Sequence, residues 1–239
     1  MKALRLELYQ ETACYKKPFA FKVGETYPLP PYSTVKGWLH ALLEAEQLIP
    51  MHLSVQGNYE AKMLDYQAHY FAKKQQSDEF PLILAGLPGV QDHDFADMTR
   101  MPLYVHLLYN VHLLLHVVAE ESILDRLAER IIQADCHLSL GRWEDLVRVD
   151  NVELVDVRPV DAPAVTEYDA YIPAEMLDEA IPSIPYRLSW TYDIRGNTRR
   201  WHTVDVGYVP KGTSIQPGEA WIDERGSLAF LFPEIEIEG

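Results

Sequence analysis

The stretch LYVHLLYNVHLLLHV, residues 103–117, decides the fold of this chain because its apolar residues alternate along its whole length. Side chains of a β-strand point to opposite faces in turn, so the pattern predicts a long strand whose odd-numbered face lies in the core. The even-numbered face carries polar and aromatic side chains, which include Tyr104, His106, Asn110, His112 and His116.

The three histidines of this face do not predict a metal site. Along a strand, positions four or six residues apart are separated by about 13 Å or more, which is too far for one ion. We therefore interpret them as an interface or a feature of the sheet surface.

The elements on either side of this strand give the order of the fold. An alternating pattern predicts a strand at Lys2–Tyr9, and an apolar stripe predicts a helix from Ser33 to about Gln47. A long strand or hairpin is expected at Ser54–Phe71, an amphipathic helix at Glu121–Ile132 and a strand at Val147–Val157. Residues 72–100 are polar and are expected to be irregular. The order strand, helix, strand, strand, helix, strand is typical of an α+β, ferredoxin-like fold, which RNA-recognition domains also use.

The sequence divides into two parts at residue 157. We expect a domain at residues 1–157 and a C-terminal extension at 158–239. Residues 157–185 are acidic and rich in proline, which indicates a connecting segment. Tyr186–Val209 is typical of a β-hairpin that turns at residues 195–197, and a second hairpin is expected around Asp223–Gly226.

Composition indicates a folded protein with a sizeable core, because 48% of the 239 residues are hydrophobic and 24% are charged. No apolar run approaches the roughly 18 residues that a membrane span needs, and no signal-peptide pattern is present, so we expect a cytoplasmic protein without a membrane contact. Cys14 and Cys136 lie far apart and predict neither a disulfide framework nor a zinc site. We expect no cofactor and no metal.

The net charge of −15 disfavours a nucleic-acid-binding protein, but the acidity is segregated. Residues 1–75 hold nine Lys/Arg and seven Asp/Glu, residues 120–184 hold five and sixteen, and residues 187–211 hold five and two. Local patches rather than the total attract phosphate, so a small RNA footprint is compatible with this composition. The acidic 120–184 segment is expected to face solvent or a basic partner.

Residues 30–37, PPYSTVKG, predict a helix start with Ser33 as the N-cap. The first-turn amides of residues 34–37 would be free, Lys36 adds a charge, and Gly37 allows close approach, which together favour a phosphate site. The alternative is an ordinary capped helix in which Gly37 permits tight helix packing.

Two further segments are candidates for binding. In Ser139–Asp145, a Gly141-Arg142 turn could offer amides and a guanidinium to phosphate while Trp143 stacks on a base; the alternative is a plain turn with Trp143 buried. At residues 195–202, three arginines beside a tryptophan suit an RNA backbone or an acidic protein equally well, and a solvated hairpin tip is the third interpretation. No metalloprotease, Walker or nucleophile-elbow motif is present, so no catalytic residue is predicted.

Together, the N-terminal strand, the PPYSTVKG helix start, the SLGR loop at 139–142 and the segment from Tyr186 to Pro210 resemble CRISPR-associated protein family five, particularly its type I-B-like members. The likeness extends over nearly the whole chain. It implies a ferredoxin-like (RRM-like, RAMP) fold with a thumb hairpin, which we place within residues 54–100 with Lys73 and Lys74 as contacts.

The resemblance also implies a function and partners. Such a subunit caps the foot of a type I surveillance (Cascade) complex and grips the 5′ tag of the guide RNA (crRNA). It contacts the first backbone subunit and the large subunit that reads the motif beside the target, so target DNA near that motif is a further candidate partner. The candidate RNA-binding residues are Lys16, Lys17, Ser33, Thr34, Lys36, Gly37, Lys73, Lys74, Gly141, Arg142, Trp143, Arg195, Arg199 and Arg200.

Two alternatives to a non-catalytic RNA-binding subunit stay open. In the type I-C branch the family member cuts repeat RNA without metal, using a tyrosine, a lysine and a histidine, and no such set can be aligned convincingly in this sequence. An RNA-recognition domain outside CRISPR systems is the third hypothesis, and the lack of an aromatic-rich RNP-like strand counts against it.

Overall fold

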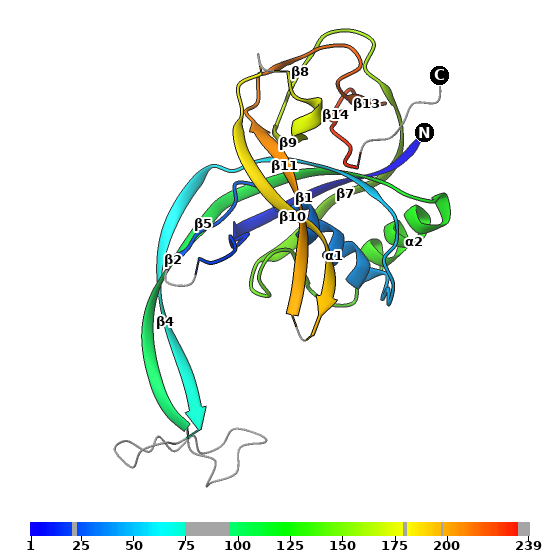
Figure 1. Ribbon diagram of the computed structural model, residues 1–239. Helices are drawn as coiled ribbons and strands as arrows, with labels where there is room; N and C mark the ends of the chain where they lie inside the picture. Colours follow the sequence, from blue (N-terminus) through cyan, green and yellow to red (C-terminus); the bar gives the residue numbers. More distant parts are fainter. Residues whose placement is uncertain (21–22, 75–95, 179–180, 197, 234–239) are drawn as a thin grey trace.

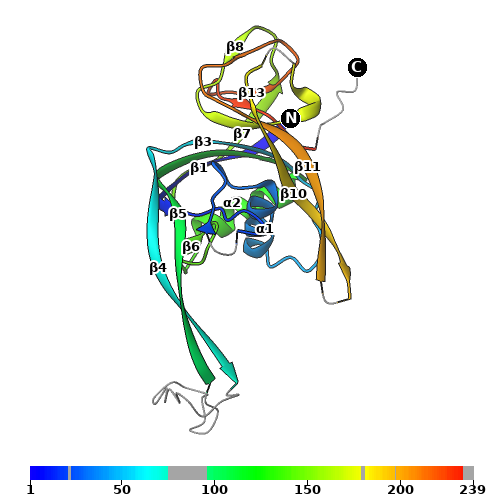
Figure 2. The ribbon, with the colours of Figure 1, turned by 60° about the vertical axis from the view of Figure 1, so that its left-hand side comes forward.

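A twisted, mostly antiparallel sheet with two helices forms the body of the protein (Figure 1). The computed structural model describes residues 1–20, 23–74, 96–178, 181–196 and 198–233, with side chains described for all of these except 70–74 and 96–100. The helices α1 (Tyr32–Leu42) and α2 (Glu121–Ile132) lie on one face, and the short C-terminal strands lie on the other (Figures 1 and 2).

Four strands form the centre of the sheet in the order β3, β5, β1, β7, and each pairs antiparallel with its neighbour. Their bounds are β1 Lys2–Ala13, β3 His52–Asn58, β5 Ala96–Val118 and β7 Leu146–Pro159. The predicted order of strands and helices is therefore confirmed, and the predicted bounds of α2 match the structure.

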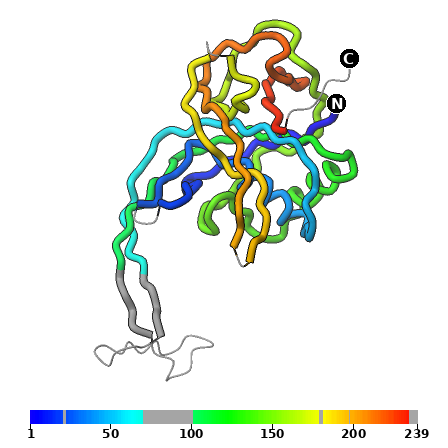
Figure 3. Tube along the Cα trace, in the orientation of Figure 1, coloured from blue at the N-terminus to red at the C-terminus, as the bar shows by residue number. Residues whose placement is uncertain are grey.

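Strand β5 extends far beyond this centre, where β4 (Ala61–Lys74) pairs with it. Strands β3 and β4 follow one another along β5 in a single register, from His52 opposite Val118 to Lys74 opposite Ala96. The resulting hairpin projects from the body as a long arm (Figures 1 and 3). The expectation that residues 72–100 are irregular is wrong for 72–74 and 96–100, which are strand.

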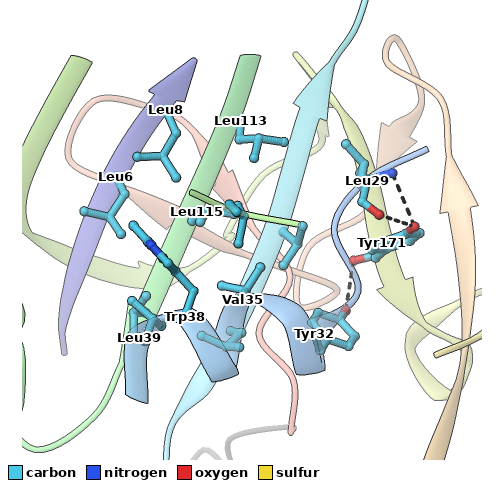
Figure 4. Close-up of a cluster of buried hydrophobic side chains, with 14 of the residues drawn as sticks. Leu6, Leu8, Leu29, Tyr32, Val35, Trp38, Leu39, Leu113, Leu115 and Tyr171 are labelled. Atoms are coloured by element: carbon cyan, nitrogen blue, oxygen red, sulfur yellow. Dashed lines mark hydrogen bonds between the residues drawn. The ribbon is translucent and has the colours of Figure 1, made fainter. Parts of the chain in front are cut away.

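The main core lies between the sheet and the two helices. Apolar side chains of α1 and α2 pack on the inward residues of β1, β3 and β5, and Figure 4 shows Val35, Trp38 and Leu39 facing Leu6 and Leu115. The predicted odd-numbered core face of β5 is confirmed from Val111 to Val117. It is wrong at residues 107–109, where Leu108 lies in the core and Leu107 and Tyr109 are partly exposed. Tyr171 connects this core to the segment before α1, because its hydroxyl donates to the Leu29 carbonyl at 2.9 Å.

The C-terminal residues continue the same sheet. Strand β9 (Asp169–Pro173) pairs with β3 and β11, and β10 (Ile184–Arg195) and β11 (Thr198–Val209) form the predicted hairpin at the sheet edge. The interpretation of residues 157–185 as a connecting segment is wrong for β9, whose Ala170, Tyr171 and Ile172 are buried. Prolines flank this short strand, so the sequence pattern did not indicate a strand here. Both faces of the strand are buried by contacts with residues that are distant in sequence.

Short elements complete the chain. The second predicted hairpin is β13 (Trp221–Asp223) with β14 (Leu228–Ala229). Its strand β13 pairs antiparallel with the end of β7. The others are β2 Val23–Gly24, β6 Leu138–Ser139, β8 Ala164–Val165, β12 Ser214–Ile215 and the 3₁₀ turn Ala174–Met176. A second core of eight buried residues forms among these elements, β9 and β11.

His116 corrects the interpretation of the three histidines as a surface feature. The β13–β14 hairpin covers this end of the even-numbered face, so the His116 side chain is fully buried. Its Nε2 lies 3.0 Å from Asp223 Oδ2, and the same oxygen accepts a hydrogen bond from Arg5 Nε at 3.0 Å. The backbone amides of Arg225 and Ser227 donate to the other carboxylate oxygen. Burial alone would raise the pKa of Asp223, but the His116 and Ser227 hydrogen bonds and the nearby positive charges outweigh it and lower that pKa.

We expect Asp223→Asn to lower the free energy of unfolding by about 3 kcal/mol, because Arg5 would lose its buried counter-ion and keep only its ion pair with the half-exposed Glu7. A lowered carboxyl pKa contributes stability above the unfolded-state value of about 3.9 and loses it as pH falls through the folded-state value. Urea unfolding between neutral and acidic pH measures both effects, and the variant should lose part of the acid dependence. Asp161→Asn, in an exposed pair with Arg158, is the matched control and should change little. Equal effects of the two variants would contradict a role of the buried network in stability.

Candidate nucleic-acid interface

The start of α1 does not have the geometry of a capped anion site. Pro31 is the N-cap, Tyr32 is the first helical residue, and no side chain caps the helix, so the prediction of Ser33 as N-cap is wrong. The amides of Thr34 and Val35 donate to the Pro31 carbonyl at 2.9 and 3.2 Å. They are therefore not free, and the phosphate site predicted from free amides of residues 34–37 lacks its main donors. The physical reason is that Pro31, fixed in φ, begins the turn two residues early.

Lys36 is directed at a strand rather than at solvent. Its side chain packs over the Trp190 ring, with Nζ 3.8 Å from the ring centroid, and Nζ donates to the Trp190 carbonyl. Burial lowers the pKa of Lys36 to about 8. Gly37 is exposed, and a Cβ there would meet no atom within 4 Å, so Gly37 does not serve tight helix packing.

In the Ser139–Asp145 loop, the guanidinium of Arg142 is engaged by neighbouring carboxylates. Its Nη2 lies 2.7 Å from Asp145 Oδ1 and its Nη1 lies 2.8 Å from Glu144. Asp145 is fully buried and also accepts hydrogen bonds from the amides of Arg142 and Cys14. Arg142 therefore shapes the turn, while Trp143 is 86% exposed and available for stacking.

Gly141 makes this turn possible, because its φ of +111° is strained for any other residue and an added Cβ would lie 2.9 Å from Asp145 Oδ2.

We expect Gly141→Ala to lower the free energy of unfolding by roughly 1–3 kcal/mol. The matched variant Gly37→Ala lies in open space inside a helix and should raise it by up to about 1 kcal/mol. Thermal unfolding of both variants measures the difference. Effects of the same sign and size would contradict the strain assigned to residue 141.

The loop of residues 139–145 lies beside the Lys16–Lys17 segment. The Cys14 amide donates to Asp145 Oδ2 at 3.0 Å, and a Cβ at Gly141 would touch the Cys14 carbonyl and the Tyr15 ring. Two of the predicted binding segments, which are more than a hundred residues apart in sequence, are thus brought together.

Lys17 belongs to a cluster at the base of the β4–β5 hairpin, which we call the hairpin-base cluster. Its Nζ lies 5.9 and 5.6 Å from the centroids of the Tyr27 and Tyr186 rings and pairs with Glu25 at 3.2 Å. Burial lowers the pKa of His106, the charges of Lys62 and Lys17 lower it further, and Glu25 opposes them. The cluster consists of Lys17, Glu25, Tyr27, Lys62, His106 and Tyr186.

Sequence patterns did not assign Lys62, Tyr27 or Tyr186 to a site. The one signal for Lys62 is alternation with Leu64 and Tyr66 along β4, which places exposed side chains on the face that carries His106 and Tyr104 of β5. The Tyr66 and Tyr104 rings meet edge to face at 5.5 Å on that exposed face. The arm thus presents aromatic surface beside the cluster. Lys73 and Lys74 lie further along β4, and their side chains are outside the described residues.

The tip of the β10–β11 hairpin carries the predicted arginines. Arg195, Arg199 and Arg200 are exposed, and the Arg199 guanidinium lies 4.7 Å from the Tyr192 ring, which meets Trp201 edge to face at 5.1 Å. A groove of about 600 Å³ between α1 and this hairpin brings Ser33, Lys36 and Gly37 together with Arg199. We call it the α1–β10 groove. Thr34 does not line it, and the 139–145 loop lies elsewhere.

The described residues contain no group of three or more His, Cys, Asp or Glu side chains that could hold a metal ion. No helix among them is long and apolar enough to cross a membrane. The binding segments described above offer cations and aromatic rings, which bind phosphates and stack on bases.

Residues 3–211 match the family model described as CRISPR-associated protein (Cas_Cas5). The chain belongs to this family. Among curated proteins, none matches the sequence. The resemblance drawn from the helix start, the SLGR loop and the late hairpin is thereby confirmed at the level of the family.

Solved structures similar to this Cas5-family chain have low sequence identity to it. A chain of a "CRISPR RNA-guided surveillance complex" has a TM-score of 0.54 at 15% identity, covering 88% of this chain and 91% of that chain. A "CRISPR protein from Archaeoglobus fulgidus" has a TM-score of 0.45 at 12% identity, covering 96% and 98%. The first likeness supports the mostly antiparallel sheet with two helices as the fold of this chain.

Proposed function

We propose that this chain is a non-catalytic subunit of a CRISPR ribonucleoprotein complex of type I-B-like architecture, and that it holds the 5′ tag of the crRNA. The observation that carries the proposal is membership of the Cas5 family over residues 3–211. The hairpin-base cluster supports it physically, because a lysine that lies over two tyrosine rings suits single-stranded RNA. In such a complex the chain would contact the backbone subunit, the large subunit and target DNA near the adjacent motif.

The proposal includes an assignment of the parts of the fold. The strand order β7, β1, β5, β3 with α1 and α2 on one face supports a ferredoxin-like (RAMP) domain at residues 1–157. The projecting β4–β5 hairpin is the proposed thumb, with Lys73 and Lys74 as RNA contacts along it. Residues 158–239 are the proposed extension, although their strands share the main sheet.

The proposed RNA path crosses the base of the thumb. Lys16 belongs to the Cys14–Lys17 segment, and Arg142 and Asp145 hold the 139–145 loop, which carries Trp143, against this segment. Lys17 and Lys62 lie in the hairpin-base cluster, and Tyr66 and Tyr104 offer ring surface on the arm. Cations track the phosphates and the exposed rings take the bases.

We expect Lys17→Gln with Lys62→Gln to weaken RNA binding and to reduce the salt dependence of the affinity by about 0.7 in the log–log slope for each phosphate that is no longer neutralised. Fluorescence anisotropy with a crRNA-length oligonucleotide at several salt concentrations measures both. The control is Lys2→Gln with Lys211→Gln, which changes the net charge equally at exposed positions away from the cluster. Equal losses of RNA affinity in the two double variants would contradict the proposed RNA path.

We expect Lys36→Met to leave RNA affinity and its salt slope unchanged, because the ammonium group is already held by the Trp190 carbonyl and ring. The same anisotropy titration tests this. A decrease comparable with that of the Lys17 and Lys62 variant would restore Lys36 as an RNA-binding residue.

A second candidate function is metal-independent cleavage of repeat RNA. One observation favours it: His106 has a lowered pKa beside Lys62 and Lys17, and its Nδ1 is buried without a hydrogen-bond partner among the described residues. A neutral imidazole can accept a proton from a 2′-hydroxyl while a lysine stabilises the developing charge. Incubation with repeat RNA in EDTA separates the functions. Specific cleavage that His106→Gln abolishes would establish the nuclease and overturn the non-catalytic proposal.

A further inference from the structure

The α1–β10 groove has walls that the RNA path does not use. One wall is the outer side of α1 and the turn that follows it, with Ala41, Ala45 and Leu48. The other is one face of the β10–β11 hairpin, where Tyr192 is opposite Trp201 and Ile194 is opposite Arg199 in the strand register. The hairpin runs beside α1, and its tip projects past the helix in two views (Figures 1 and 2).

Large apolar side chains of this groove are exposed. Ile194 is 72% exposed, Leu48 is 62% exposed, and Tyr192 and Trp201 are each 42% exposed. Exposed apolar side chains that converge from two elements mark a surface that another molecule covers. Two of the four are aliphatic and have no ring on which a base can stack, so their contribution lies in apolar packing with protein side chains.

The charges of the groove are separated along its length. Glu44 and Glu46 lie at the end of α1, and Arg199 lies toward the hairpin tip with Arg195 and Arg200 nearby. No carboxylate pairs with these arginines in the described part of the chain, whereas Glu44 pairs with Arg130 at the surface. The acidic end of the groove would repel an RNA backbone. A peptide with a basic end and an acidic end would pair with the acidic and the basic ends of the groove.

We propose that the α1–β10 groove is a docking site for a segment of another protein, with aliphatic or aromatic anchors, an acidic residue that pairs with Arg199 and a basic residue that pairs with Glu46. The anchors enter between Leu48 and the Ile194–Trp201 face. The Lys36–Trp190 contact lies in the lining of the groove and holds the hairpin against α1. This surface goes beyond RNA binding and does not depend on it.

A displayed library of random peptides, selected against the full chain, tests the proposal. We expect the selected peptides to share apolar anchors with an acidic residue at one end. Ile194→Asp should weaken a synthetic selected peptide roughly tenfold or more, because it places a charge among the anchors. Ile184→Asp is the matched control, since Ile184 is an exposed isoleucine at the other end of the same strand and should leave affinity unchanged.

Charge exchange gives a second readout. Arg199→Glu should weaken the same peptide, and replacing the peptide's acidic residue by lysine should restore binding to that variant. Binding that survives Ile194→Asp, or a selection that yields no groove-dependent peptide, would overturn the proposal.

Other occupants give distinct results that would also overturn it. If Ile194→Asp reduced the affinity for the crRNA-length oligonucleotide, the groove would belong to the RNA path. If it abolished a dimer seen by analytical ultracentrifugation, the occupant would be a second copy of this chain. The oligonucleotide measurement also keeps failure of this proposal separate from failure of RNA binding.

Discussion

The pairing of β1 with β5 is the interaction on which the rest of the structure depends. The two strands exchange backbone hydrogen bonds from Leu4 opposite Val117 to Ala13 opposite Leu108, and their inward leucines form the floor on which both helices pack. Because β5 also pairs with β3 and β4 along its other edge, one strand aligns the body and the projecting arm. Residues at the base of the arm, including Lys62 and His106, are therefore held by the same ladder that holds the core.

Much of this framework could be predicted from the sequence, because strand alternation and helical stripes are local patterns. The period of two in residues 103–117, the amphipathic stripe of Glu121–Ile132 and the turn of the late hairpin each act over a few residues. The N-cap error was local, because Pro31 begins the helix two residues before Ser33, whereas two other errors arose where partners are far apart in sequence. His116 resembles a surface residue until Asp223, 107 positions later, covers it, and Lys36 resembles a free cation until Trp190, 154 positions later, binds it. No local pattern contains either contact.

Intrachain pairing also explains why a count of basic residues did not locate the site. Arg142 is bound by Asp145 and Glu144, Arg5 by Asp223, and Arg187 by Asp205, so these arginines offer little to an external phosphate. The cations that offer more are Lys17 and Lys62, which lie in a cluster with tyrosine rings and a single carboxylate. In a chain of net charge −15, the local excess of cations over carboxylates decides where an anion can bind, and the total charge does not.

Lys36 connects the core to the α1–β10 groove. A buried ammonium group is costly unless a polar or aromatic partner replaces water, and the Trp190 carbonyl and ring supply that replacement. Since Trp190 also packs against Phe232 and Tyr32, the contact ties the β10–β11 hairpin to the start of α1 and to the C-terminal residues of the described chain. The hairpin is thereby held beside α1 on the helix-bearing side of the sheet, and its exposed tip extends beyond this fixed point. A residue whose sequence context indicates phosphate binding thus serves to set the geometry of a groove for a different class of partner.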